Sequence, residues 1–132
     1  MIGAIIGDIV GSRFEFGAVP QKDFELFTPD CSYTDDTICT VAIADAVLNE
    51  RDYQESLLDW CRRYPDPMGG YGNRFYQWIN SDNPLPTNSF GNGSAMRVSP
   101  IGWLFDEWED VVEEAKKSAI VSHNHPEGIK GA

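Results

Sequence analysis

Two aspartates stand side by side between two threonines in the segment Thr34-Asp35-Asp36-Thr37. Carboxylate and hydroxyl oxygens are the hard ligands that Mg²⁺, Mn²⁺ and Ca²⁺ prefer, so this segment is a candidate metal site. Neighbouring residues inside a helix point about 100° apart, but at a junction of loop and helix the backbone can aim both carboxylates inward. The alternative is a plain helix start, with Thr34 as its cap and the aspartates complementing the helix dipole. The spacing of these residues alone favours the helix cap over the metal site.

A glycine-bearing loop, Ser89-Phe90-Gly91-Asn92-Gly93, is a candidate anion site. If such a loop leads into a helix, its free backbone N–H groups can bind a pyrophosphate. The spacing is not that of a dinucleotide-binding fingerprint or a P-loop, and the P-loop lysine is missing. A simple Asn-Gly turn is the alternative interpretation. A second glycine loop, Gly69-Gly70-Tyr71-Gly72, is less specific still.

Glu15 is a candidate acid or base, because it lies between Phe14 and Phe16 in the loop after the first predicted helix. Apolar neighbours raise the pKa of a carboxyl group, which suits proton transfer near neutral pH. Arg13 can equally pair with Glu15, and the sequence does not decide between these alternatives.

Two histidines flank one asparagine in His123-Asn124-His125. A zinc site needs further cysteine or histidine ligands, and none is suitably spaced to complete one. The sequence therefore favours histidines that cap carbonyls at a helix end or that contact a ligand.

Helical periodicity dominates the elements that must position these residues. The first segment carries an apolar stripe with Asp8 and Gly11 on its opposite side, and it predicts a short buried helix with a small-residue back. Residues 12–33 lack a period and predict a long loop. Residues 35–50 are apolar nearly all round and predict a central buried helix. Further helices are expected at residues 53–64, around 75–79, at 108–119 and from 126 onward. No strand is expected, so the class is all-α and residues 1–132 form a single domain.

Composition narrows the possible partners. The net charge of −11, without a basic stripe, argues against binding to nucleic acid or to anionic membranes. A phosphorylated ligand would then have to be held by metal ions or backbone N–H groups. Three cysteines without a CxxC pair predict reduced thiols in a cytoplasmic protein. The apolar first residues match neither a signal peptide nor a membrane span.

Taken together, these segments resemble the ADP-ribosylglycohydrolase family, which includes the dinitrogenase-reductase-activating glycohydrolases. The resemblance spans nearly the whole chain, and the Thr-Asp-Asp-Thr and Gly-Asn-Gly-Ser-Ala-Met-Arg strings are specific when they occur together. The matching segments, in family order, are Gly7–Gly11 with Glu15, Tyr33–Thr37, Gly70–Gly72, Gly91–Arg97 and Ser122–Ala132.

The resemblance implies an all-α bundle with a two-metal site at its centre. Thr34, Asp35 and Asp36 would ligate Mg²⁺ or Mn²⁺, and Glu15 would act together with Asp35 and Asp36 near the reacting ribose. The activity implied is metal-dependent hydrolysis of the glycosidic bond that links ADP-ribose to a protein side chain or a small acceptor. The residues expected to line the ADP-ribose pocket are Tyr71, Gly72, Ser89, Phe90, Gly91, Asn92, Gly93 and His123.

One departure from the family pattern qualifies that activity. Family members are about twice as long and bring a second acidic motif, of Asp-x-Asp-Thr type, which this sequence lacks. The chain is therefore interpreted as the N-terminal half of a family domain, apparently truncated, with weak metal binding and little activity alone. The alternatives are a non-catalytic ADP-ribose-binding module and a structural remnant that self-associates or pairs with a missing C-terminal half. The type of linkage (arginine, serine or small molecule) stays open.

Overall fold

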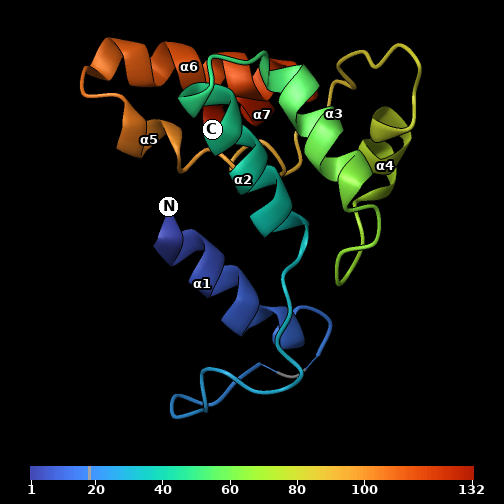
Figure 1. The fold of residues 1–132 in the computed structure, drawn as a ribbon, viewed down its shortest axis with the longest axis vertical. Coiled ribbons are helices and arrows are strands. Elements are labelled where there is room, and N and C mark those ends of the chain that lie inside the picture. Colours follow the sequence, from blue (N-terminus) through green and yellow to red (C-terminus); the bar gives the residue numbers. More distant parts are fainter. Residues whose placement is uncertain (18) are drawn as a thin grey trace.

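The computed structural model describes residues 1–17 and 19–132, and its regular elements are all helical. Within these residues there is no β-strand, only an isolated bridge between Thr34 and Met68. The predicted all-α class is confirmed. The helices, shown in Figure 1, are α1 (Ile2–Gly11), the 3₁₀ turn η1 (Ser12–Phe14), α2 (Asp35–Leu48), α3 (Tyr53–Arg63), α4 (Asn73–Ile79), α5 (Ile101–Leu104), α6 (Trp108–Ile120) and α7 (Pro126–Gly131).

Helix α2 is the centre of the molecule, as its apolar sequence predicts. Ile38, Ala42 and Ile43 are fully or almost fully buried, and α2 contacts α1, α3 and α5. Thr34 caps its first turn by accepting the backbone N–H of Asp36 at 3.2 Å. The cap interpretation of the Thr-Asp-Asp-Thr segment is therefore correct for Thr34, and it does not by itself exclude a second role for the residue.

Helix α3 packs antiparallel to α2 across a short connection. Asp52 caps it by accepting the N–H groups of Gln54 and Glu55. The two helices are joined side to side because buried Ser56 donates its hydroxyl to the carbonyl of Ala42 at 2.7 Å. This pair forms the rigid support on which the N-terminal end of α2 is held.

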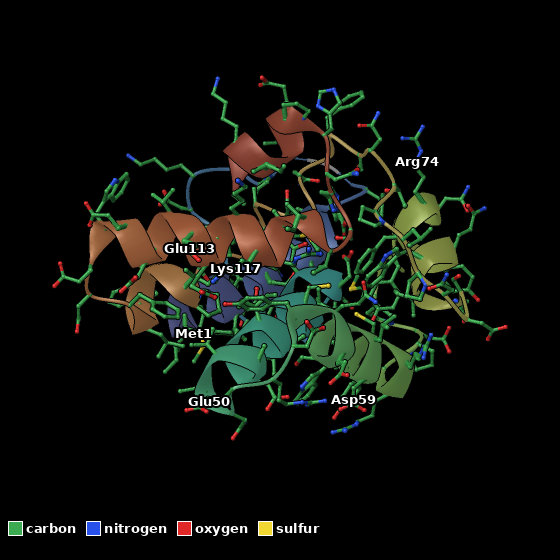
Figure 2. All side chains as sticks on the ribbon, turned by 90° about the horizontal axis from the view of Figure 1, so that it is seen from above. Met1, Glu50, Asp59, Arg74, Glu113 and Lys117 are labelled. Atoms are coloured by element: carbon green, nitrogen blue, oxygen red, sulfur yellow. The ribbon has the colours of Figure 1, made fainter. Side chains whose placement is uncertain are left out.

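Helices α6 and α7 lie on the opposite side of the molecule from α1 (Figure 1). Ala115 and Ala119 are the apolar side chains that α6 buries, and Ile101 of α5 is also fully buried. On the outer side of α6, Glu113 and Lys117 form an ion pair of 2.7 Å, visible in Figure 2. Trp108 and Val112 of α6 are apolar but exposed.

Helix α1 differs from its prediction. Val10 is the only buried residue in α1, while Ile2 is 71% and Ile6 45% exposed. Periodicity identifies a face that is suited to burial, but it does not say what covers that face, and among the described residues α1 packs chiefly against α2 and η1. None of the described helices, α1 included, combines the length and apolar character needed to cross a membrane.

Candidate functional site

The first half of the site is a cavity of about 360 Å³ at the N-terminal end of α2. We call it the acidic cavity, because Asp8, Glu15 and Asp36 all line it together with Thr34. Four parts of the chain meet here: α1 with the start of η1, the turn after η1, the start of α2, and the 89–93 loop. The remaining lining residues are Gly7, Gly11, Ser12 and Asn92.

Asp8 holds the acidic cavity together, although it was not among the candidate site residues predicted from the sequence. Its Oδ1 accepts the hydroxyl of Thr34 at 2.6 Å, and its Oδ2 accepts the backbone N–H of Thr34 at 2.9 Å. The same Oδ2 accepts the N–H of Thr37 at 3.2 Å and its hydroxyl at 2.5 Å. A carboxylate only accepts, so both threonine hydroxyls must donate to it. The sequence signal was available, since an acid on the small-residue face of a helix can approach another backbone closely.

The orientation of Thr34 follows from these bonds. Its hydroxyl proton points at Asp8, and one oxygen lone pair accepts the N–H of Asp36. A hydroxyl oxygen has two lone pairs, so one remains for a further partner. Thr34 is buried and lines the acidic cavity, which makes that lone pair a pre-oriented ligand position.

Negative charge is concentrated at this end of α2. Burial, and then the neighbouring Asp8, raise the pKa of Asp36. Partial desolvation of the mostly exposed Glu15 side chain, followed by Asp36 and Asp8, raises its pKa. Burial, followed by Asp36 and Glu15, raises the pKa of Asp35 to about 6. Carboxyl groups that disfavour one another's ionised form in this way are stabilised as carboxylates by a cation.

Glu15 lies against the second glycine loop, residues 69–72. An added Cβ at Gly69 would lie 2.9 Å from Oε2 of Glu15, and Gly69 has a φ of +81°, which glycine adopts without strain. Arg13 does not pair with Glu15: it donates to the hydroxyl of Thr28 at 2.6 Å and to the carbonyl of Glu25. The alternative of an Arg13–Glu15 ion pair is therefore not realised.

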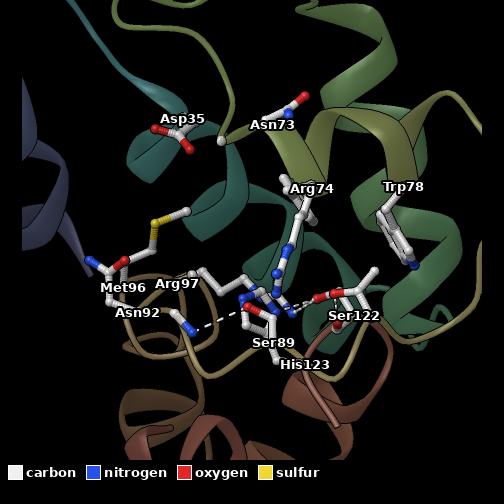
Figure 3. A pocket seen from close by; sticks show the side chains of 15 residues that line it. Asp35, Asn73, Arg74, Trp78, Ser89, Asn92, Met96, Arg97, Ser122 and His123 are labelled. Atoms are coloured by element: carbon white, nitrogen blue, oxygen red, sulfur yellow. Dashed lines mark hydrogen bonds between the residues drawn. The ribbon is translucent and has the colours of Figure 1, made fainter. Parts of the chain in front are cut away.

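The second half of the site is a cavity of about 430 Å³ between α4, the 87–97 segment and the start of the 122–125 turn. We call it the donor pocket. Figure 3 shows Ser89, Ser122 and His123 gathered on one side of it, with Asp35 apart from them. Asn92 lines both cavities, so they adjoin. The predicted site residues that line the donor pocket are Asp35, Gly72, Ser89, Gly91, Asn92, Gly93 and His123.

Two residues predicted to bind the ligand lie outside that lining. The hydroxyl of Tyr71 donates to the carbonyl of Tyr64 at 2.7 Å, which turns the half-buried ring toward the end of α3. Phe90 is 71% exposed, and its ring meets the ring of His125 edge-on at 5.4 Å. The two aspartates also separate, because Asp35 lines the donor pocket and Asp36 the acidic cavity.

The 89–93 loop is fixed by α7. Buried Ser94 donates its hydroxyl to the carbonyl of Gly128 at 2.7 Å. An added Cβ at Gly128 would lie 2.5 Å from the carbonyl oxygen of Ser89, so only glycine fits there. The loop runs into turns rather than into a helix, so the condition for a helix N-terminus is not met, and regular helix resumes only at α5. Tertiary contacts, not a helix N-terminus, therefore hold this loop.

A buried arginine lies beneath the donor pocket. Arg97 is fully buried, and its Nη2 donates to the carbonyl of Ser118 at 2.8 Å and to the hydroxyl oxygen of Ser122 at 2.9 Å. Its Nε and Nη1 have no hydrogen-bond partner within the described residues. Burial, and then the charge of Arg97, lower the pKa of His123 to about 4, so His123 is neutral at pH 7.

His125 has a structural role, and it caps α7 at the N-terminal end rather than capping carbonyls. Its Nδ1 accepts the backbone N–H of Glu127 at 3.1 Å, and Pro126 occupies the first helical position. Across residues 1–17 and 19–132 no three histidine, cysteine, aspartate or glutamate side chains converge as a metal site. The oxygens of Thr34, Asp36 and Glu15 have the chemistry that a hard cation needs, but they form an incomplete ligand set.

The fold and the site together define a helical protein with an acidic cavity beside a donor-lined pocket. The family model for ADP-ribosylglycohydrolase matches residues 1–132, and the chain belongs to that family.

Similar proteins are known by sequence and by structure. The chain is 28% identical over 162 residues to ADP-ribosylhydrolase ARH3 of Xenopus tropicalis, a match that covers 100% of this chain and 46% of the relative. It is 28% identical over 167 residues to ADP-ribosylhydrolase ARH3 of Homo sapiens, with the same two coverages. The chain thus spans about half the length of these relatives. A chain of an ADP-ribosylglycohydrolase-related protein complex shares the fold with a TM-score of 0.66 at 20% identity, over 98% of this chain and 49% of that one.

Proposed function

We propose that this chain binds ADP-ribose and contributes one side of a metal-dependent site that hydrolyses the glycosidic bond between ADP-ribose and a protein side chain or small acceptor. The observation that carries the proposal is the pairing of two cavities at Asn92, one rich in carboxylates and one lined by hydrogen-bond donors. Family membership supports the reaction type, and the geometry supports separate positions for the cation and for the ligand.

Mg²⁺ or Mn²⁺ would be held by Thr34 and Asp36 of the acidic cavity together with Asp35, which shares the first turn of α2 with Asp36 but lines the adjoining donor pocket. When bound, such an ion orients ribose hydroxyls and lowers the pKa of a bound water. The protein's own contribution is to fix the ligand atoms: Asp8 accepts the hydrogen bond of the Thr34 hydroxyl, which leaves one lone pair of the Thr34 oxygen for the cavity. Removing a supporting carboxylate of this kind typically lowers metal affinity by about 10- to 100-fold.

The donor pocket would hold the ADP-ribose. The backbone N–H groups of Asn92 and Gly93 and the neutral ring of His123 are donors without charge, and Arg97 adds buried positive charge beneath them. Such donors suit phosphate and ribose oxygens. This arrangement explains how a protein of net charge −11 can bind an anion without surface lysines.

Glu15 is proposed to transfer the proton at the reacting ribose. Burial and two neighbouring carboxylates raise its pKa, which is the shift that acid–base catalysis near neutral pH requires. Glu15→Gln keeps the shape but removes the titrating group. The proposal for Glu15 is contradicted if this variant keeps near-normal turnover with its metal ions bound.

The isolated chain is proposed to turn over slowly. Thr34, Asp35 and Asp36 offer about three ligands, whereas Mg²⁺ takes about six. A polypeptide that supplies a second acidic motif would complete the set. One observation favours a second function, a non-catalytic ADP-ribose-binding module: within the described residues no three acidic or histidine side chains converge as a metal site.

Calorimetry with ADP-ribose separates these functions. Titrations are carried out with Mg²⁺ and with EDTA, on the wild type, on Asp36→Ala and on Asp106→Ala, an exposed control outside both cavities. Binding that needs Mg²⁺ and is lost only in Asp36→Ala supports the metal-dependent site. Equal binding in EDTA supports the binding module. An ADP-ribose release assay on the same proteins then measures turnover.

A further inference from the structure

We propose that Arg97 and Ser122 are positioning residues that fix His123 as the tautomer with its proton on Nε2, so that the ring offers an N–H donor to acceptor oxygens in the donor pocket. This inference deepens the proposed ligand site and rests on it only for the identity of the ligand. The assignment of the proton rests on hydrogen bonds alone.

The first step is the direction of the bond between Arg97 and Ser122. A guanidinium group is a donor only, so at 2.9 Å its Nη2 donates and the Ser122 oxygen accepts. The other Nη2 proton goes to the carbonyl of Ser118 at 2.8 Å. Arg97 is fully buried and Ser122 is 1% exposed, so water does not compete for these groups.

The second step is the proton of Ser122. The Ser122 oxygen lies 2.9 Å from Nδ1 of His123, and that nitrogen is the only acceptor its hydroxyl proton has among the described hydrogen bonds. The positive charge of Arg97 also favours a hydroxyl whose proton points away from it. Ser122 therefore donates to Nδ1, which must be unprotonated. In a neutral imidazole the proton is then on Nε2.

The third step is where Nε2 lies. An added Cβ at Gly93 would lie 3.0 Å from both Cε1 and Nε2 of His123, so this edge of the ring faces the glycine loop. His123 lines the donor pocket, and no described hydrogen bond uses its Nε2. Figure 3 shows Arg97, Ser122 and His123 on the same side of the pocket, with hydrogen bonds drawn between them. The free N–H is thus available to a ligand oxygen.

Burial strengthens the arrangement. The low pKa of His123 keeps the ring neutral at pH 7, and a neutral ring has one donor and one acceptor nitrogen. The hydroxyl of Ser122 makes Nδ1 the acceptor and leaves Nε2 as the donor. A pocket with the donor at Nε2 favours phosphate, carboxylate or ribose oxygens and disfavours ligand groups that only donate.

Nitrogen NMR of the histidine rings tests the tautomer directly. The chain has only two histidines, His123 and His125, and a His125→Asn variant identifies the signals while keeping a capping side chain. At pH 7 we expect Nε2 of His123 to show the shift of a protonated ring nitrogen and Nδ1 that of an unprotonated one. A protonated Nδ1 in the wild type overturns the proposal, and this measurement needs no pocket variant to fold.

Ser122→Ala removes the donor to Nδ1. Its His123 nitrogen shifts should move toward an average of the two tautomers, while Ser122→Thr, which keeps a hydroxyl, should restore them. Ser118→Ala is the matched control, because Ser118 is a buried serine of α6, one turn before Ser122, and among the described hydrogen bonds its hydroxyl donates only to the carbonyl of Ala115. Unchanged nitrogen shifts of His123 in a folded Ser122→Ala variant contradict the proposal that Ser122 fixes the tautomer.

Binding provides the second measurement. Calorimetry with ADP-ribose and Mg²⁺ should give about tenfold weaker affinity for Ser122→Ala and an unchanged value for Ser118→Ala. Equal affinity of Ser122→Ala and the wild type, with the tautomer changed, overturns the role of the donor in binding. If the wild type binds no ADP-ribose but shows the expected tautomer, the proposed function fails and the positioning of His123 stands.

Discussion

The acidic cavity and the donor pocket adjoin at Asn92, yet they are built in opposite ways. The acidic cavity gathers acceptors: three carboxylates and a threonine oxygen whose proton is directed away from the cavity. The donor pocket gathers donors: loop N–H groups, a neutral histidine and a buried guanidinium beneath them. One cavity is therefore suited to a cation, and the other to the oxygens of an anionic ligand.

The two cavities also differ in what holds them together. A single carboxylate, that of Asp8, joins α1 to the start of α2 across 26 residues of sequence. The donor pocket is fixed by several bonds between residues 87–97 and 118–128, among them Ser94 to Gly128. The comparison predicts that one substitution disrupts the fold of the acidic cavity, whereas the fold of the donor pocket withstands the loss of any single hydrogen bond and is disturbed mainly by steric changes.

The largest effect is expected for Asp8→Ala. It removes four hydrogen bonds at once and leaves the N–H groups of Thr34 and Thr37 without this acceptor. The free energy of unfolding should fall by about 3 kcal/mol, and Mn²⁺ affinity by about 10- to 100-fold. Urea unfolding and manganese titration measure the two effects. Asp106→Ala, an exposed aspartate, is the control and should change neither. A loss of stability below about 1 kcal/mol would show that Asp8 is not the single support of this cavity.

The same contrast explains how much the sequence could predict. Helices with a strong period, such as α2 and α3, were predicted, and Thr34 was predicted as a possible cap of α2. The role of Asp8 was not, because it depends on which distant backbone α1 approaches. The glycine loop was predicted as a site, but its support by Gly128 requires knowing that α7 packs there. Local patterns therefore predicted the candidate residues and the helices other than η1 and α5, while long-range contacts determined which of them meet.

The second prediction tests the donor pocket sterically. Gly128→Ala places a Cβ 2.5 Å from the backbone oxygen of Ser89, so α7 or the loop must shift. The free energy of unfolding should fall by about 2 kcal/mol, measured by urea unfolding. Gly131→Ala is the matched control in the same helix, because its Cβ meets only the Cβ of Ala95 at 3.8 Å. Equal stabilities of the two variants would mean that α7 does not fix the loop.

The third prediction uses the pH dependence of the donor pocket. Burial and Arg97 lower the pKa of His123 to about 4 in the folded protein, below its ordinary value of about 6.5. Between these values the unfolded chain binds the proton more tightly. The contribution of His123 to stability is therefore complete above about pH 6.5 and is lost as the pH falls toward 4.

That contribution should be about 1.5 kcal/mol between pH 7 and pH 5. The measurement is the difference in unfolding free energy between wild type and His123→Gln at each pH, because the difference cancels the carboxyl groups that titrate in both. A difference that does not change with pH would mean that His123 becomes charged in the folded protein as readily as in the unfolded chain.

The smallest effect is expected for Glu15→Gln, and it has the opposite sign. Asp36 and Asp8 raise the pKa of Glu15, so at pH 7 its charge destabilises the metal-free fold. Its side chain is exposed, and solvent screens the repulsion; the gain from Gln should therefore be only a few tenths of a kcal/mol. The gain should fade as salt is added, because the effect is electrostatic. Glu25→Gln, outside both cavities, is the control.

With saturating Mn²⁺ the wild type should become more stable than Glu15→Gln, since a bound cation turns the same crowded carboxylates from mutually repelling groups into ligands. Failure of that reversal would separate the acidic cavity from metal binding and leave the donor pocket as the functional half of the site.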